Sequence, residues 1–331
     1  MKEILNYLYD HKTLTKAEAK KVLTNMANGL YNNSQIASFI SVYLMRAITV
    51  DEISGFRDAL LDLCIPVDLG AYNTIDLCGT GGDGKDTFNI STLASFVVAG
   101  AGGKVAKHGN YAVSSTCGSS NIFEYFGYSF SNEEQKLQAE IEETGICFLH
   151  APLFNPAMKN VAPVRKELAM KTFFNMLGPM VNPSFPKNQM VGVFSLELAR
   201  LYSYLYQQWG KNFNIIHGLD GYDEISLTGG FKSISNKGEH LLQPTDLGLS
   251  YHQPIELAGG TNVKEAAKIF ESVLKNEGTR AQHEVTVANA AFGLRCLYPA
   301  KSIPECVAMA DESIRNKSAY KSFTSLMEMQ S

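Results

Sequence analysis

The segment DLCGTGGDGKDTFNIST, residues 76–92, combines a short apolar strand pattern, a glycine-rich loop and the start of a helix. Because Gly79, Gly81, Gly82 and Gly84 have no Cβ, the backbone of this loop can approach an anion closely. The first N–H groups of the following helix, and its dipole, favour negative charge at the same place. The segment therefore predicts a βα unit with a phosphate site in its loop.

The same loop is close to the phosphate-binding pattern G-x-x-x-x-G-K-[ST] of nucleoside triphosphatases. Gly79, Gly84 and Lys85 fit this pattern, but Asp86 occupies the position of the hydroxyl residue that binds magnesium. An acidic side chain there would repel nucleotide phosphates, so we reject an ATPase. Taken alone, the loop is equally compatible with a glycine-rich turn that binds nothing.

Composition predicts a folded, soluble protein with a large core. The chain has 331 residues, of which 45% are hydrophobic and 19% charged, enough for one large domain or two ordinary ones. The net charge of −4 favours neither a nucleic-acid partner nor a membrane surface, and no apolar run reaches the ~20 residues of a membrane span. The N-terminal residues lack a signal-peptide pattern, so we expect a cytoplasmic protein.

Six cysteines are scattered without CxxC spacing, which argues against a structural zinc site and against a disulfide framework. The histidines form no HExxH pattern, and no GxSxG motif is present. Zinc chemistry and serine-hydrolase chemistry are therefore not expected.

The N-terminal part of the chain predicts helices. Two capping boxes, Thr15 with Glu18 and Thr49 with Glu52, indicate helix starts. Apolar residues between and after them recur at helical spacing. We expect an all-helical domain over residues 1–66, completed by a returning helical segment near 156–185.

After residue 66, short apolar runs alternate with glycine-containing loops and helical patterns, which is typical of βα units. We predict an α/β domain over residues 67–331, with a mainly parallel central sheet flanked by helices. Residues 263–316 are expected to be helical. The expected strands are residues 75–78, 104–107, 147–150, 190–194 and 213–217.

Two further segments carry polar groups at predicted strand ends. The segment from Lys107 to Ser120, KHGNYAVSSTCGSS, brings one cation, one amide and several hydroxyls to a loop that could close over a ligand. Asp223 and Glu224 follow the last predicted strand, and adjacent carboxylates at such a strand end can bind Mg²⁺. Taken alone, each segment is better explained as a solvated turn, and only the presence of two phosphate-type loops favours metal binding by the acidic pair.

The segment PVRKEL contains Arg165 in a helical context. A guanidinium group can bind a substrate carboxylate through two parallel hydrogen bonds. An ordinary ion pair on a helix surface remains an equal alternative on spacing alone.

Taken together and in this order, GTGGD, NIST, KHGN, PAMKNVAPVRKEL, FNMLGP and HGLDGYDEIS resemble the anthranilate phosphoribosyltransferase family over nearly the whole chain. The resemblance implies transfer of the phosphoribosyl group of phosphoribosyl pyrophosphate (PRPP) to the amine of anthranilate in tryptophan biosynthesis. It also implies two Mg²⁺ ions and a homodimer that forms through the helical domain, with no nucleic-acid or membrane partner.

The resemblance further implies roles for individual residues. Catalysis would involve Lys107, Asn110 and Arg165, and the metals would be bound by Ser91, Asp223 and Glu224. Anthranilate would contact Gly79, His108, Asn110, Arg165 and Gly178. The donor-binding residues would be Gly79, Gly82, Asp83, Thr87, Asn89, Ser91, Thr92, Lys107 and Ser119.

The chain departs from common family residues at seven positions near these motifs. They are Tyr111, Ala112, Thr116, Cys117, Phe154, Asn155 and Lys171. Two alternatives remain open on the sequence: a pyrimidine nucleoside phosphorylase of the same fold, and a relative that binds nucleic acid without catalysis. Against them stand the acidic pair after the last strand, PVRKEL, which suits a carboxylate acceptor, and the negative net charge.

Overall fold

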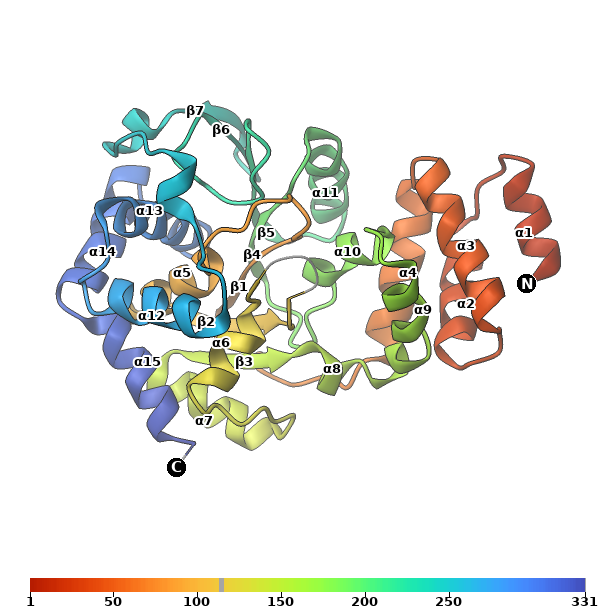
Figure 1. The fold of residues 1–331 in the computed structure, drawn as a ribbon, viewed down its shortest axis with the longest axis horizontal. Helices are drawn as coiled ribbons and strands as arrows, with labels where there is room; N and C mark the ends of the chain where they lie inside the picture. The colour runs from red at the N-terminus through yellow and green to blue at the C-terminus, as the bar shows by residue number, and fades with distance from the viewer. Residues whose placement is uncertain (113–115, 331) are drawn as a thin grey trace. The chain divides into compact units, whose positions relative to one another are not determined.

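The computed structural model describes residues 1–112 and 116–330, and the chain divides into two compact units (Figure 1). The first contains Met1–Pro66 and Ala151–Pro183, and the second contains Val67–His150 and Ser184–Ser331. None of the helices in these described residues combines the length and the apolar character that crossing a membrane requires.

The first unit is entirely helical. Helices α2 and α4 begin at the predicted capping boxes, where Thr15 and Thr49 accept the backbone N–H groups of Glu18 and Glu52. The helices are α1 (Lys2–Tyr9), α2 (Lys16–Ala27), α3 (Asn33–Met45), α4 (Val50–Leu63), α8 (Ala151–Phe154), η1 (Pro156–Asn160), α9 (Ala162–Leu168), α10 (Phe173–Leu177) and η2 (Gly178–Met180).

Aromatic side chains join the returning segment to the N-terminal helices. Phe173 of α10 stacks on Phe56 of α4, with ring centroids 4.6 Å apart, and meets the edge of Tyr43 of α3 at 5.1 Å. Phe39 completes this cluster. Because residues far apart in sequence share one core, the helical unit depends on its second segment, Ala151–Pro183.

A buried carboxylate organises the same unit. Glu52 is fully buried and accepts hydrogen bonds from the Leu14 N–H at 3.0 Å, the Tyr43 hydroxyl at 3.2 Å and the Arg46 guanidinium at 2.5 and 2.9 Å. Burial alone would raise the pKa of Glu52, but the bonds from Arg46, Thr49 and Leu14 hold it below its ordinary value.

Replacing Glu52 by Gln should lower the free energy of unfolding by about 3 kcal/mol, because Arg46 would lose its partner in a buried position. Urea denaturation would measure the loss. The matched control is Glu18→Gln, the same position of an exposed capping box, which should cost under about 1 kcal/mol. Equal losses in the two variants would contradict a special role for Glu52.

The second unit contains a seven-stranded sheet of order β3-β2-β1-β4-β5-β6-β7. The pairs from β3 through β5 are parallel, and β6 and β7 continue the sheet antiparallel. The predicted, mainly parallel sheet is therefore confirmed. The strands are β1 (Thr74–Gly79), β2 (Lys104–Gly109), β3 (Ile146–His150), β4 (Asn188–Gly192), β5 (Asn212–Gly218), β6 (Phe231–Ser235) and β7 (Gly238–Leu242).

All five predicted strands are present, but β4 begins and ends earlier than the expected residues 190–194. Its first residues, Asn188 and Gln189, are fully buried polar side chains, which a search for apolar runs does not find. The Asn188 amide is satisfied by the Thr74 carbonyl at 3.0 Å, so this burial leaves no lost hydrogen bond.

Helices cover both faces of the sheet. Helices α5 and α13 pack on β1, and Figure 1 shows α11 on the opposite side of β4 and β5 from α13. Besides the short 3-10 helices η3 (Pro244–Leu247) and η4 (Pro254–Leu257), the helices of this unit are α5 (Ile90–Gly100), α6 (Ser119–Tyr125), α7 (Glu134–Thr144), α11 (Leu196–Gln208), α12 (Val263–Leu274), α13 (Arg280–Leu297), α14 (Ile303–Arg315) and α15 (Ser318–Glu328).

The strand order reverses direction at β1. The chain moves from β1 to β2 and β3 on one side, and then returns to β4 on the other side of β1. In open parallel sheets, ligands bind beyond the carboxyl ends of the strands at such a reversal. The fold therefore predicts a ligand site at the loops that follow β1 and β4.

Candidate active site

The glycine-rich loop follows β1 at this reversal. Gly81, Gly82 and Gly84 adopt φ values of +68°, +79° and +76°, a region that side chains with a Cβ disfavour. The loop is joined to the end of β4 by a hydrogen bond from the Thr80 N–H to the Gly192 carbonyl, at 2.9 Å. The expected strand, glycine loop and helix start are all present.

The acidic pair predicted after β5 contacts this loop. The Asp223 carboxylate accepts the Gly81 N–H at 2.7 Å, and the Glu224 carboxylate accepts the Ser91 N–H of α5 at 3.0 Å. Two segments more than 130 residues apart in sequence thus meet through charged acceptors and backbone donors. The structure brings together three of the predicted elements here.

Two glycines make this approach possible. A Cβ on Gly79 would collide with the Asp223 carboxylate, and a Cβ on Gly192 would collide with the Asp223 backbone carbonyl. Gly79 was predicted as a site residue, but Gly192 was missed. A glycine within a strand pattern indicates close approach of another backbone. The position of Gly192 in the segment MVGVF could therefore have predicted this contact.

Electrostatics at the acidic pair favour a bound cation. Burial, and after it the charge of nearby Asp83, raises the pKa of Asp223 above its ordinary value. Burial raises the pKa of Glu224 as well, and the charges of Asp223 and Asp83 add to it. Carboxylates that repel one another when ionised are stabilised by a nearby cation, so the acidic pair is compatible with a divalent metal that takes its other ligands from water or substrate.

Two lysines lie near the loop. Lys107 is 2% exposed, and its ammonium group donates to the Leu77 carbonyl at 2.7 Å, beneath the loop rather than in it. Burial lowers the pKa of Lys107. Lys85, at the tip of the loop, lies over the Tyr222 ring at 4.6 Å from its centroid.

The KHGN segment follows β2, the neighbour of β1. The His108 N–H donates to Asp76 at 3.2 Å, and the Asn110 side-chain oxygen accepts the Tyr111 N–H at 2.8 Å. The Ser119 hydroxyl donates to the Asn110 carbonyl at 3.4 Å. Residues 113–115 of this segment lie outside the described residues.

Hydrogen bonds join this segment to the glycine-rich loop. The Asn89 amide donates to the Cys117 carbonyl at 3.0 Å, and Asp86 accepts both the N–H and the hydroxyl of Thr116, at 3.0 and 2.7 Å. Asp86, the residue on which an ATPase was rejected, therefore connects the glycine-rich loop to the KHGN segment. Thr116 and Cys117 are two of the departures from common family residues.

The remaining predicted donor residues lie on the same loop and helix. Thr92 is buried in the first turn of α5, and Thr87 forms a β-bridge with Ala258. The Thr80 hydroxyl, which was not predicted, is buried and has no hydrogen-bond partner among the residues that the structure describes. It is available to a bound ligand.

Arg165 and Gly178 belong to the first unit, whereas Gly79, His108 and Asn110 belong to the second. Arg165 lies 4.9 Å from the centroid of the Phe174 ring, and burial lowers its pKa. No carboxylate of the described chain forms an ion pair with it. The Asn155 side-chain oxygen, in the same unit, is also buried without a described partner.

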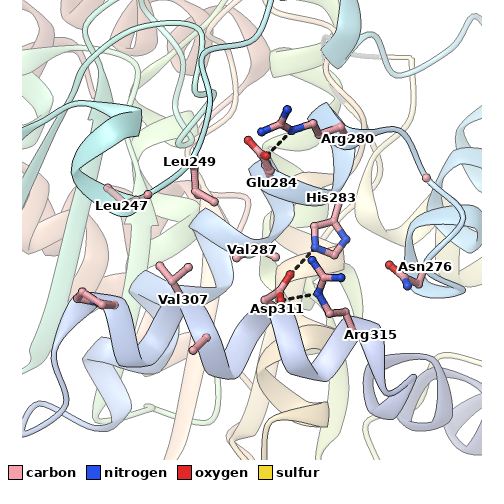
Figure 2. A pocket seen from close by; sticks show the side chains of 14 residues that line it. Leu247, Leu249, Asn276, Arg280, His283, Glu284, Val287, Val307, Asp311 and Arg315 are labelled. Carbon is pink, nitrogen blue, oxygen red and sulfur yellow. Dashed lines mark hydrogen bonds and ion pairs between the residues drawn. The ribbon is translucent and has the colours of Figure 1, made fainter.

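A separate pocket of about 670 Å³ lies between α13 and α14 and contains none of the predicted site residues (Figure 2). Its charged groups pair with one another. Glu284 accepts from Arg280 at 2.7 Å, and Asp311 accepts from His283 at 2.7 Å and from Arg315 at 2.5 Å. The pair of His283 and Asp311 joins α13 to α14, whereas the other two pairs each lie within one helix.

Comparison with known proteins identifies the family. A model described as the a/b domain of a glycosyl transferase family matches residues 71–320, and one described as the helical bundle domain matches residues 2–64. The anthranilate phosphoribosyltransferase of Flavobacterium psychrophilum is 65% identical over 294 residues, 89% of each chain. That of Christiangramia forsetii is 58% identical over 99% of each chain.

The chain belongs to the anthranilate phosphoribosyltransferase family.

Solved structures agree with this assignment. The anthranilate phosphoribosyltransferase of Thermus thermophilus has a TM-score of 0.92 at 31% identity, with 98% of each chain covered. The Saccharomyces cerevisiae enzyme, solved in complex with PRPP and Mg, has a TM-score of 0.88 at 27% identity, covering 96% of this chain and 93% of that one. The predicted family, fold and glycosyltransferase class are confirmed.

Replacing Gly192 by Ala should lower turnover at least about 100-fold, because the new Cβ would displace Asp223 and misplace its carboxylate. Steady-state kinetics would measure the loss, and thermal unfolding would show whether the fold persists. Gly70→Ala is the control, since a Cβ there meets only the Asp68 side chain, at 3.0 Å. Normal turnover in Gly192→Ala would contradict the close approach.

Proposed function

We propose that this chain transfers the phosphoribosyl group of PRPP to the amine of anthranilate and releases pyrophosphate, in the biosynthesis of tryptophan. The observation that carries the proposal is the docking of Asp223 and Glu224 on the glycine loop and the first turn of α5. Cleavage by free phosphate, as in a nucleoside phosphorylase, has no need for such a metal-binding pair. A pyrophosphate leaving group, with its larger charge, does.

We propose that two Mg²⁺ ions bind in this site and that Ser91, Asp223 and Glu224 hold them. Among the described residues, no group of three or more His, Cys, Asp or Glu side chains could hold a metal by itself. Mg²⁺ commonly takes one or two carboxylates and completes its shell with water and substrate phosphates, which agrees with a pair of carboxylates. When bound, Mg²⁺ neutralises the charge that develops on the pyrophosphate.

In the proposed donor site, loop N–H groups and the start of α5 bind the phosphates. Gly79 and Gly82, which have no Cβ, would allow the backbone to approach the phosphates, and the Thr80 hydroxyl would add a donor that has no partner among the described residues. The other proposed donor residues are Asp83, Thr87, Asn89, Ser91, Thr92, Lys107 and Ser119. Because the Lys107 ammonium bonds to Leu77, we propose that it acts by its charge from beneath the loop.

For the acceptor, we propose that Arg165 binds the anthranilate carboxylate and that Asn110 orients the amine. Arg165 is a partly buried cation without a described carboxylate partner, and a substrate carboxylate would supply one. His108, Gly79 and Gly178 would also contact the acceptor. An aromatic amine is uncharged at neutral pH, so orientation can replace a strong general base.

The Mg²⁺ requirement should depend on pH. Since the pKa values of Asp223 and Glu224 are raised, protons compete with the metal as the pH falls from 8 to 6. The Mg²⁺ concentration needed for half-maximal turnover should then rise, by up to about tenfold per pH unit for each proton displaced.

The control separates this effect from titration of PRPP itself. Asp223→Asn should weaken activation by Mg²⁺ at pH 8 and flatten its pH dependence, because one titrating carboxylate is gone. Glu197→Gln, on the exposed surface of α11, should behave as the unsubstituted enzyme. Identical pH dependence in Asp223→Asn and the unsubstituted enzyme would contradict the assignment.

The acceptor assignment is tested with Arg165→Ala. The fall in anthranilate fluorescence on consumption should slow by about 100-fold or more at fixed anthranilate, while calorimetry shows unchanged PRPP binding in the presence of Mg²⁺. Lys166→Ala, the exposed neighbour on α9, should stay within about twofold.

A second substrate sharpens this test. Aniline lacks the carboxylate, so the unsubstituted enzyme should strongly prefer anthranilate and Arg165→Ala should lose most of this preference. No consumption of anthranilate by the unsubstituted enzyme would overturn the proposed function, and phosphate-dependent cleavage of uridine or thymidine would favour the nucleoside phosphorylase instead.

We also propose a cytoplasmic homodimer that forms through the helical unit. Large apolar side chains are exposed on this unit, including Tyr9 at 56%, Leu30 at 66% and Met45 at 88%. All six cysteines are free, which suits a reducing compartment. Light scattering of the purified enzyme would give its oligomeric state.

A further inference from the structure

His150 has no part in the roles assigned so far, although it lies at the edge of the site. It is the last residue of β3 and pairs in register with Gly109 of the KHGN segment on β2. Its side chain is 6% exposed. A polar ring buried at the carboxyl end of a parallel strand is where functional groups gather in this kind of sheet.

The contacts of His150 fix its orientation. Its Nδ1 lies 2.9 Å from the hydroxyl of Ser120, a fully buried residue of α6. Its ring stacks on Phe130, with centroids 4.2 Å apart and planes 12° from parallel. Tyr111 meets the same ring edge-on at 5.0 Å. Burial lowers the pKa of His150, so the ring is neutral near pH 7.

These contacts lead to Asn110 by two routes. The N–H of Ser120 donates to the Asn110 carbonyl at 3.2 Å. Ser120 therefore contacts both the His150 ring and the Asn110 backbone. The N–H of Tyr111 donates to the Asn110 side-chain oxygen at 2.8 Å, and the Tyr111 hydroxyl donates to Glu124 of α6 at 3.2 Å. With its oxygen so engaged, the Asn110 side chain has its NH₂ group left to donate.

We propose that His150 is a positioning residue that, through Ser120 and Tyr111, fixes Asn110 in the orientation that binds the acceptor. This inference rests on the proposed function. It explains why Tyr111 follows KHGN in this chain, because an aromatic ring at that position covers the histidine and bonds to α6.

The pair of His150 and Ser120 gives a sharp test, because each partner can be replaced by a residue of similar shape. His150→Phe keeps the stacked ring and leaves the Ser120 hydroxyl buried without a partner, whereas Ser120→Ala leaves the imidazole nitrogen without one. Each single variant should raise KM for anthranilate about tenfold. PRPP affinity in the presence of Mg²⁺ should stay within about twofold.

The double variant His150→Phe/Ser120→Ala removes both polar groups, so no buried group is left unsatisfied. It should keep the raised KM of the single variants, because the bond proposed to position Asn110 is absent in all three, whereas its melting temperature should recover toward that of the unsubstituted enzyme. His240→Phe, on the exposed strand β7, is the matched control and should change neither KM nor PRPP affinity.

The outcomes distinguish positioning from a role in folding. An unchanged KM in both single variants, even with a lowered melting temperature, would overturn the inference and leave the proposed function intact. A loss of PRPP affinity equal to the rise in KM would also overturn it, because the whole site would then be disturbed. Failure of the unsubstituted enzyme to consume anthranilate would instead overturn the proposed function.

Discussion

The hydrogen bonds from Gly81 and Ser91 to Asp223 and Glu224 are the interaction on which the site depends. They join the loop after β1 to the segment after β5, across β4, which lies between those strands in the sheet. Asp223 is buried and Glu224 is half-buried, and backbone N–H groups replace only part of the solvation that the two carboxylates lose. Their raised pKa values express this deficit, and it is what makes them suited to a metal.

The same interaction constrains the rest of the second unit. Since Asp223 approaches the backbone at the ends of both β1 and β4, those positions have to be glycine, and the two strands have to be neighbours. Ile225, the next residue but one after Asp223, exchanges two hydrogen bonds with the Asn289 side chain of α13, at 3.1 and 2.9 Å. The acidic pair is therefore fixed from the sheet on one side and from a buried helix on the other.

Much of this fold could be predicted from the sequence, because its determinants are local. Capping boxes fixed the starts of α2 and α4, and glycine-containing loops after apolar runs indicated five strands of the sheet. Strands β6 and β7 were not predicted, since β7 is mostly exposed and has no apolar run. The start of β4 was missed because its polar residues are buried by pairing with other strands, which spacing along the chain does not reveal.

The glycine-rich loop of the candidate site was easier to predict than the contacts that join this loop to distant residues. The glycine-rich loop is a continuous segment whose strand, glycines and helix start are adjacent in sequence, so its local structure could be predicted, while its role in binding the donor stays a prediction. The contacts of Gly192, Asp86 and His150 join residues that are distant in sequence, and no local pattern specifies them. The resemblance to the family could not predict these contacts either, because it transfers only the residues that members share. Tyr111, which contacts His150, is a departure from the common family residue.

The path of the chain accounts for the division of the proposed acceptor residues between the two units. In an ordinary parallel sheet, a crossover helix joins one strand to the next. Here the chain leaves the second unit after His150, at the edge strand β3, and re-enters at Ser184 before the central strand β4. The intervening residues contribute Phe173 to the core of the helical unit and carry Arg165. One crossover therefore both completes the helical unit and supplies the proposed carboxylate-binding cation, while His150, the last residue before it, remains bonded to the loop that bears Asn110. If Arg165 binds the acceptor as proposed, a substitution in this crossover alters acceptor recognition and leaves in place the bonds from Gly81 and Ser91 to Asp223 and Glu224.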